Sequence, residues 1–327
     1  MSERDVQIQD RPEGQGPSPA PGANSNLWGL VVVPAGIVIA IMVVGALFGA
    51  LTGSESSLDE NLELVVHGGK NQRTQALFNL ARQASENQRA YAERLAGGDA
   101  ELPWPMAQGF PQRVRDAVDE LDEDEYETRL VLAVLLSTLD EPEGSELLRR
   151  FLELGDTEDP DQSLRMRAIQ NLGILGDAAA TQAVIGFLDH KEHVLRLAAA
   201  GALSQLPGDG VRAALESALG DGVLDVRATA ALSASKLDPP LDSAGPLLRE
   251  LTGKEIYAAE REQDPHRFTR ARDVSQFRAL AVTALGRLGL TEDRAFLESL
   301  RGDSDLLVAE AAMKVLDTWG AEAGSGQ

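Results

Sequence analysis

The chain of 327 residues contains no cysteine. Disulfide bonds, thiolate zinc sites and cysteine nucleophiles are therefore excluded. Aromatic residues make up only 4% of the sequence, while alanine and leucine are abundant, and this balance favours helices over a β-sandwich or barrel. Basic residues are also few, 30 against 52 acidic ones, and the resulting formal charge of −22 argues against nucleic-acid binding.

Motifs of known catalytic sites are missing as well. The sequence has no Walker-type glycine loop, no GxGxxG and no serine in a GxSxG motif. Among its four histidines only His190 and His193 lie near each other, and although two imidazoles could bind zinc, a solvated turn is the more typical role. We therefore expect no catalytic residue, no bound metal and no cofactor.

One long apolar run predicts a membrane span. Leu27–Leu51 has no charged residue, and as a helix with a rise of ~1.5 Å per residue it would reach about 37 Å, enough for a hydrocarbon core of ~30 Å. A cleaved signal peptide would have a shorter apolar region and a small-x-small site, which this run lacks. The sequence thus predicts a single-pass membrane protein.

The flanks of this span predict its orientation and its surroundings. Arg4 and Arg11 precede the span, whereas the first basic residue after it is Lys70, and this bias places the N-terminus in the cytoplasm and the following domain outside. Residues 1–26 are rich in proline, glycine and serine and predict a disordered polar tail. Gly45 and Gly49 form a GxxxG pair that suits a homodimer, although ordinary lipid-facing glycines give the same spacing.

A repeat of about 30 residues dominates the rest of the chain. An arginine is followed seven residues later by a leucine, or once by an alanine, and ten residues later by a leucine. The arginines are Arg129, Arg165, Arg196, Arg227 and Arg278, and the leucines at the seventh position are Leu136, Leu172, Leu203 and Leu285. A final, weaker copy begins at Leu306. Five arginines at one fixed place in the repeat indicate a structural contact, each with an acid or a carbonyl between units.

Each copy reads as a helical hairpin. A first helix such as "VLRLAAAGALSQL" is followed by a breaker, "PGDG", and a second helix, "VRAALESALG". One hairpin cannot bury both of its apolar faces, so neighbouring hairpins must stack into an α-solenoid. The leucines at the seventh and tenth positions should then be core, and the small residues Ala198 to Gly201 should mark close helix packing.

The repeats resemble a known family. The segments "SLRMRAIQNLGILGDAAATQAVIGFLDH" and "FRALAVTALGRLGLTEDRAFLESLRGD" are similar to HEAT-like repeats, in the short bacterial variant also seen in phycobilisome lyase subunits. The resemblance covers about residues 126–320 and implies an all-α fold, a right-handed α-solenoid of HEAT-like hairpins preceded by one transmembrane helix. Such repeats serve mainly as scaffolds for binding.

The remaining segments complete the expected domain organisation. Residues 52–60 read as a linker, and residues 61–125 read as atypical capping helices, with Arg73 and Leu80 in the repeat positions. Residues 126–320 form the solenoid, and residues 321–327 form a disordered tail.

The repeat is interrupted once, between Arg227 and Arg278. An insertion at about 253–276 carries basic and aromatic residues in an otherwise acidic protein. The functional interpretation is a docking element for a partner's carboxylates or phosphates, and the alternative is a longer helix pair whose arginines neutralise nearby acids. The candidate partner-binding residues are Tyr257, Arg261, His266, Arg267, Phe268, Arg270 and Arg272.

The sequence as a whole favours a non-enzymatic scaffold. We expect it to be tethered to the membrane and to present an acidic repeat surface, with the stacked second helices as its concave face, to membrane-associated protein partners and not to nucleic acid. The alternative is a lyase-like or chaperone-like subunit that acts on a chromophore-bearing or other protein partner. That role needs a cofactor pocket, and no polar cluster in the sequence marks one.

Overall fold

The computed structural model describes residues 57–95, 109–139 and 141–325, and this part of the chain contains helices and no strands. The α-helices are α3 (Leu58–His67), α4 (Lys70–Leu95), α5 (Phe110–Glu120), α6 (Tyr126–Thr138), α7 (Pro142–Phe151), α8 (Ser163–Leu175), α9 (Thr181–Gly186), α10 (His193–Ala202), α11 (Val211–Ala218), α12 (Leu224–Ala234), α13 (Gly245–Leu251), α14 (Glu255–Gln263), α15 (Ala271–Leu288), α16 (Arg294–Leu300) and α17 (Leu306–Ser325). Short 3-10 turns precede α9, α13 and α16.

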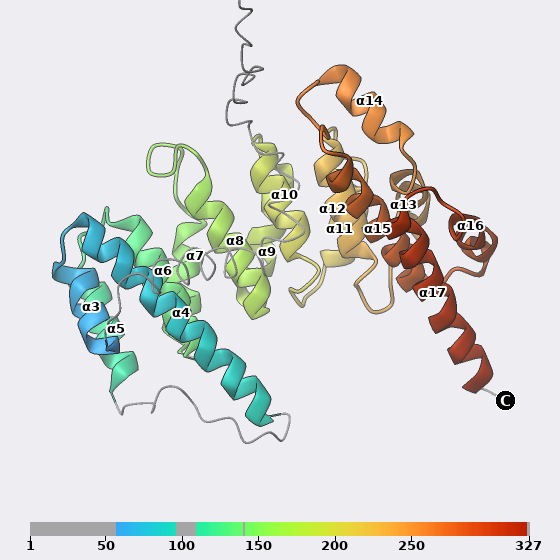
Figure 1. Cartoon of the computed structure of the whole chain (residues 1–327). Coiled ribbons are helices and arrows are strands. Elements are labelled where there is room, and N and C mark those ends of the chain that lie inside the picture. Colours follow the sequence, from blue (N-terminus) through green and yellow to red (C-terminus); the bar gives the residue numbers. More distant parts are fainter. Residues whose placement is uncertain (1–56, 96–108, 140, 326–327) are drawn as a thin grey trace, which may run out of the picture.

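The helices are stacked as two rows in a curved solenoid, with α3 near one end and α17 at the other (Figure 1). Helices α6, α8, α10, α12, α15 and α17 are the first helices of successive hairpins, and α7, α9, α11, α13 and α16 are the second. First helices pack on their neighbours, as α8 does on α10 and α15 on α17. The predicted all-α solenoid is therefore confirmed, and its core runs from unit to unit.

The repeated leucines at the seventh position are core residues. Leu136, Leu172, Leu203 and Leu285 are all completely buried, as are Ala199 and Ala200 of α10. The tenth position is less uniform: Leu206 and Leu288 are buried, but Leu175 is 38% exposed. The expectation of a core side chain at both positions therefore holds at the seventh in these four copies and fails at the tenth for Leu175.

Close helix packing depends on two glycines that the repeat pattern did not single out. A Cβ added to Gly173 of α8 would lie 2.7 Å from the Cβ of Ala202 on α10, and one added to Gly286 of α15 would lie 2.6 Å from Val315 on α17. A Cβ on Gly201, by contrast, would meet nothing nearer than the methyl group of Thr229 at 3.7 Å, an ordinary contact. Gly201 is therefore not required by packing.

Two hydrophobic cores meet at helix α6. The larger core extends from α6 to α17, and a smaller one holds α3, α4 and α5 against α6. Leu130 and Ala133 of α6 belong to the larger core, while Leu132, Leu135 and Leu136 belong to the smaller. The cap predicted from the atypical N-terminal repeat thus has a core of its own that is completed by the first regular helix.

The insertion is mostly helical. It forms α14, which stands out from the edge of the stack, and it lengthens the N-terminal part of α15 (Figure 1). Helices α12 and α15, which flank the insertion, contact each other much less than α10 contacts α12 or α15 contacts α17. The first helices therefore pack less extensively on each other between α12 and α15 than at these two neighbouring junctions.

In the part of the chain that the structure describes, no helix is both long and apolar enough to cross a bilayer. The predicted span Leu27–Leu51, with Gly45 and Gly49, lies outside the described residues and stays a prediction.

Candidate functional site

The aromatic residues of the insertion are inside the protein. Tyr257 and Phe268 are each 2% exposed, and their rings meet edge to face with centroids 5.1 Å apart, while Phe277 of α15 completes the cluster. The Tyr257 hydroxyl donates a hydrogen bond of 2.8 Å to the carbonyl of Leu251. Both rings had been predicted as surface anchors for a partner. The structure places them in the core because they join α14 to α13 and α15.

Arg267 of the insertion is engaged within the molecule. Its guanidinium forms ion pairs with Asp225 of α12 and Glu260 of α14 and lies over the ring of Phe268 at 5.0 Å. Burial raises the pKa of Asp225 above its usual value, although the Arg267 charge opposes this shift. Arg267 therefore fastens the insertion to the N-terminal end of α12, and its geometry matches the structural interpretation of these arginines.

Four of the predicted docking residues do lie on the surface. Arg261, His266, Arg270 and Arg272 are exposed, and no side-chain hydrogen bond or ion pair engages them in the described part of the chain. Partner binding at these four residues stays a prediction.

The repeated arginines make the inter-unit contacts that their fixed spacing indicated. Arg129 donates to the carbonyl of Leu121 at 3.0 Å, Arg165 to the carboxylate of Asp159 at 2.9 Å, and Arg227 to the carbonyl of Asp221 at 2.8 Å. Arg196 reaches the carboxylate of Asp221 and Arg278 that of Asp303, each in the next unit. These side chains hold turns and units together.

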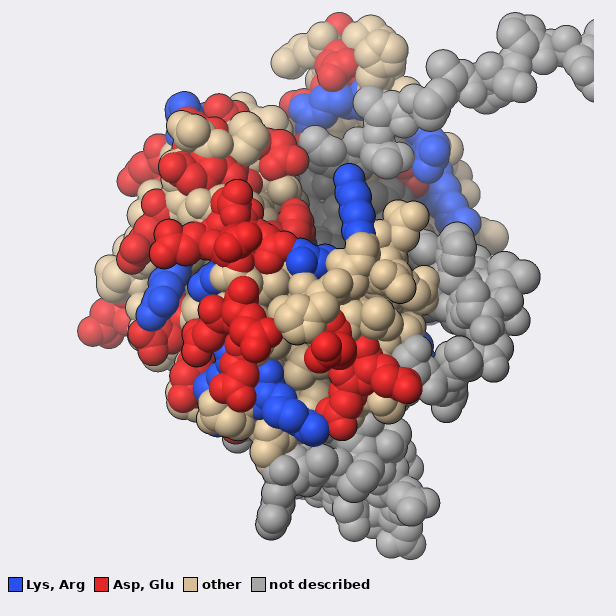
Figure 2. Space-filling model, turned by 90° about the vertical axis from the view of Figure 1, so that its left-hand side faces the viewer, with Lys and Arg blue, Asp and Glu red and all other residues tan. Residues whose placement is uncertain are grey.

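Acidic side chains gather over the end of the solenoid that carries α3 and α5 (Figure 2), where Asp119, Glu120 and Asp122 are exposed.

Most of the described lysine and arginine side chains form a hydrogen bond or an ion pair within the protein, so those that form neither are candidates for binding a partner. In the described part of the chain, the cations with neither a hydrogen bond nor an ion pair from their side chains are Lys70, Lys236, Arg261, Arg270, Arg272, Arg287, Arg294 and Lys314. Two of them, Lys236 and Arg287, line one groove.

This groove, called the α12–α15 groove below, is a cavity of about 230 Å³. Its walls are first helices and the turns that follow them: α8 gives Gln170, α10 gives Leu197, Ala198, Gly201, Ala202 and Gln205, α12 gives Thr229, Leu232, Ser233 and Lys236, and α15 gives Leu280 and Arg287. None of these residues comes from a second helix, so the predicted role of the second helices as a binding face finds no support in this pocket.

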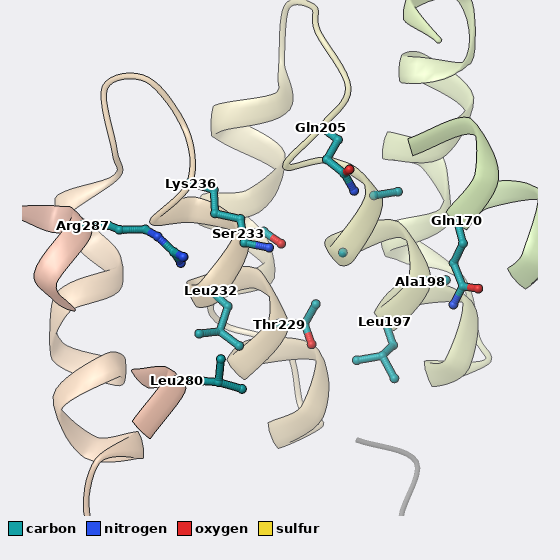
Figure 3. A pocket seen from close by; sticks show the side chains of 12 residues that line it. Gln170, Leu197, Ala198, Gln205, Thr229, Leu232, Ser233, Lys236, Leu280 and Arg287 are labelled. Atoms are coloured by element: carbon teal, nitrogen blue, oxygen red, sulfur yellow. The ribbon is translucent and has the colours of Figure 1, made fainter. Parts of the chain in front are cut away.

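Apolar and polar groups are divided along the groove. Leu197, Leu232 and Leu280 line one part, while Arg287 extends from α15 toward α12, where Lys236 and Ser233 lie (Figure 3). Partial loss of solvent around its ammonium group, together with the nearby Arg287 guanidinium, lowers the pKa of Lys236. Two like charges therefore line one space, and no carboxylate is among the described residues that line it.

Thr229 adds an unsatisfied polar group at the same place. The residue is 6% exposed, and its Oγ1 is buried without a hydrogen-bond partner in the described structure. Buried hydroxyls normally find a partner, because an unmade hydrogen bond costs about 1–3 kcal/mol. Gly201, on the facing helix α10, leaves space beside the Thr229 methyl group.

A second pocket continues the groove along the row. It has a volume of about 440 Å³, lies between α15 and α17, and shares Arg287 with the first. Lys314 and Trp319 line it, and the Trp319 indole donates a hydrogen bond of 3.1 Å to the carbonyl of Gly286. Lys236, Arg287 and Lys314 thus form a row of three cations over three successive first helices.

Comparison with known proteins agrees with the repeat architecture. Two overlapping segments, residues 114–204 and 154–236, match a family model of HEAT repeats, which supports a HEAT-like repeat fold over residues 114–236. No curated protein matches this chain. Among solved structures, human deoxyhypusine hydroxylase in complex with glycerol is similar over 82% of this chain and 97% of that chain, at 16% identity and a TM-score of 0.27. A likeness that low carries no argument about activity.

Proposed function

We propose that this protein is a non-enzymatic scaffold, tethered to a membrane by Leu27–Leu51, that binds a partner protein on the face of helices α8, α10, α12 and α15. HEAT repeats generally mediate protein–protein interaction, and this supports the coarse assignment. The tether is supported by the length and apolarity of the run in the sequence. Arg4 and Arg11 favour an extracytoplasmic solenoid.

The observation that carries the proposal is the α12–α15 groove. It combines aliphatic walls with two cations and a hydroxyl that the described part of the chain leaves without hydrogen bonds or ion pairs. Interfaces have this composition, an apolar centre beside a few polar groups that fix orientation. The groove and the second pocket together run across several successive helices, and this elongated shape favours an extended protein segment over a compact chromophore.

Site-specific photo-crosslinking in native membranes tests the scaffold. A photoreactive phenylalanine is placed in the full chain at Gln205, Leu232 or Leu280, and at Arg294 on α16 as the control. We expect one and the same protein to crosslink from the three groove positions and not from Arg294. Equal crosslinking from the control position, or none from the groove, contradicts the proposal.

Two further measurements separate the alternatives. Alkaline carbonate extraction should leave the full chain in the membrane pellet and release a variant that lacks residues 27–51. The purified full chain should show no visible absorption. A bound chromophore would favour the lyase-like alternative.

A further inference from the structure

The insertion and the α12–α15 groove belong to one arrangement. Arg267 ties the insertion to Asp225 at the N-terminal end of α12, and Phe277 near the start of α15 packs on Tyr257 and Phe268. The insertion therefore fills the space between the N-terminal parts of α12 and α15. Toward their C-terminal ends the space is open, and there Lys236 and Arg287 line it.

We propose that the α12–α15 groove binds an extended acidic segment of the partner protein, with a glutamate or aspartate carboxylate between Lys236 and Arg287 and an aliphatic side chain against Leu232 and Leu280. This inference rests on the proposed scaffold function and names the chemistry of its partner.

Charge is the first argument for an acidic occupant. The chain carries a formal charge of −22, and arginines such as Arg165, Arg196 and Arg278 are paired with acids. Lys236 and Arg287 line the same groove without such a partner in the described structure (Figure 3). A carboxylate that enters between them forms charge-assisted hydrogen bonds to both and relieves their mutual repulsion.

Thr229 supplies an independent argument. Its side chain is more than nine-tenths buried, it lines the groove, and its hydroxyl has no hydrogen-bond partner in the described part of the protein. A χ1 rotation of about 120° brings the hydroxyl to the place that the methyl group holds, beside Gly201. A peptide backbone, which alternates donors and acceptors, then satisfies this hydroxyl as well as Ser233 and Gln205.

The length of the occupant follows from the row of cations. From the α10 wall of the groove to the α17 wall of the second pocket there are three helix spacings of about 8–10 Å each, which add up to roughly 24–30 Å. An extended chain covers this distance with about eight or nine residues at ~3.3 Å each. Lys314 in the second pocket then takes a second carboxylate of the same segment.

A polynucleotide does not suit the groove, because it carries a phosphate at every nucleotide, whereas three cations line the described row. A phosphorylated peptide shares part of the chemistry, since phosphate also pairs with arginine and lysine. The carboxylate is favoured because the groove offers one lysine and one arginine, and no cluster of several arginines surrounds one point in the described structure.

Fluorescence anisotropy with the full chain in detergent tests the inference. The probe is a fluorescein-labelled peptide of 12 residues in which glutamates alternate with leucines, and its counterparts carry glutamine or phosphoserine in place of glutamate. We expect the glutamate probe to bind at least 10-fold more tightly than the glutamine probe, and its affinity to fall as salt is raised.

Variants locate the binding. The double variant Lys236→Gln and Arg287→Gln should bind the glutamate probe at least 10-fold more weakly, and Gly201→Leu should block the groove, each with unchanged thermal unfolding. Arg294→Gln removes an equally unpaired cation on α16 and should leave the affinity unchanged. If Gly201→Leu lowers the melting temperature, Gly201→Ala, whose Cβ fits without a clash, replaces it and should weaken binding by a smaller factor.

Each failure has a distinct meaning. Equal binding of the glutamate and glutamine probes, or an unchanged affinity of the double variant, overturns the acidic occupant. A phosphoserine probe that binds at least 10-fold more tightly than the glutamate probe overturns it in favour of a phosphopeptide. If a partner is crosslinked from the groove but the probe does not bind, the proposed scaffold function stands and only the acidic specificity of the groove is contradicted. If the probe binds but no partner is crosslinked, the acidic specificity stands and the scaffold function is contradicted.

Discussion

Arg196 of α10 holds both carboxylate oxygens of Asp221, which lies 25 residues further along the chain, in the turn before α12. The two bonds measure 2.7 and 3.1 Å, and both side chains are mostly buried. Burial alone would raise the pKa of Asp221, but the hydrogen bonds from Arg196 and from the backbone N–H of Val223 lower it. Arg278 and Asp303 repeat the relationship at the same separation.

Removal of either partner should therefore destabilise the solenoid. Hydrogen bonds to charged groups are worth about 1.5–3 kcal/mol, so Arg196→Ala and Asp221→Ala should each lower the free energy of unfolding by that amount. The double variant should cost less than the sum, because the second substitution removes a charge that is already unpaired. Urea unfolding of the two single variants and the double variant measures this, and strict additivity would show that the pair does not interact.

The core position of the repeat gives a prediction with a built-in control. Leu203 lies at the seventh position of one copy of the repeat and is completely buried, whereas Leu175 lies at the tenth position of the preceding copy and is 38% exposed. Leu203→Ala should cost about 2–5 kcal/mol because it leaves a cavity. Leu175→Ala should change stability by less than about 0.5 kcal/mol. Equal losses in thermal unfolding would mean that Leu175 is buried in solution.

Two glycines of neighbouring helices should respond in opposite directions to the same substitution. Gly173→Ala places a Cβ 2.7 Å from that of Ala202, so α8 and α10 must separate, at a cost of about 1–3 kcal/mol. Gly201→Ala meets no such obstacle and should raise stability by about 0.5–1 kcal/mol, since alanine favours a helix over glycine. Urea midpoints of the two variants test this, and destabilisation by both would indicate that Gly201 is also in close contact.

Acid should weaken one exposed ion-pair cluster. Hydrogen bonds from Lys191 and Arg165 lower the pKa of Asp156 from 3.8 to about 2. A carboxyl group whose pKa is lowered by folding contributes its full stabilisation at pH values above the pKa of the unfolded chain. This contribution is lost as the pH falls from about 4 toward 2. Asp156→Asn should therefore lower the urea midpoint at pH 6 and have a much smaller effect near pH 2.

The control for this variant is Glu158→Gln, which changes an exposed neighbour that makes no ion pair in the described structure. Its urea midpoint should follow that of the unmodified protein throughout. A difference between Asp156→Asn and the unmodified protein that persists undiminished at pH 2 would contradict the ion-pair explanation.

Charge reversal separates the two kinds of arginine in the insertion. Arg267→Glu brings a third carboxylate to Asp225 and Glu260 and should lower the melting temperature by several degrees. Arg270→Glu changes an exposed side chain and should leave the melting temperature unchanged. If Arg270→Glu weakens partner crosslinking without unfolding, the insertion is a docking element. Unchanged crosslinking would remove that interpretation.

Most of the fold could be predicted from the sequence because the residues that make one structural contact recur at the same spacing in several copies of the repeat. Arg196 and Leu203 have counterparts in other copies, so their structural roles could be inferred without coordinates. The groove could not be predicted in this way, because Lys236 and Arg287 lie far apart in the sequence and meet only through the spacing of α12 and α15. Tyr257 and Phe268 were misplaced for a related reason. An aromatic residue in an insertion gives no sign of whether it faces a partner or closes the gap that the insertion creates.

The position of helix α6 between the two hydrophobic cores affects how the protein unfolds. Because it contributes opposite faces to two cores, loss of α3, α4 and α5 uncovers Leu132 and Leu136 but leaves Leu130 and Ala133 in place. Unfolding can then stop at this helix, as it does in repeat proteins whose stability is the sum of local interfaces. Backbone amides on the two sides of α6 should accordingly exchange with solvent at separate rates, and the N-terminal cap can open while the grooved part of the solenoid stays intact.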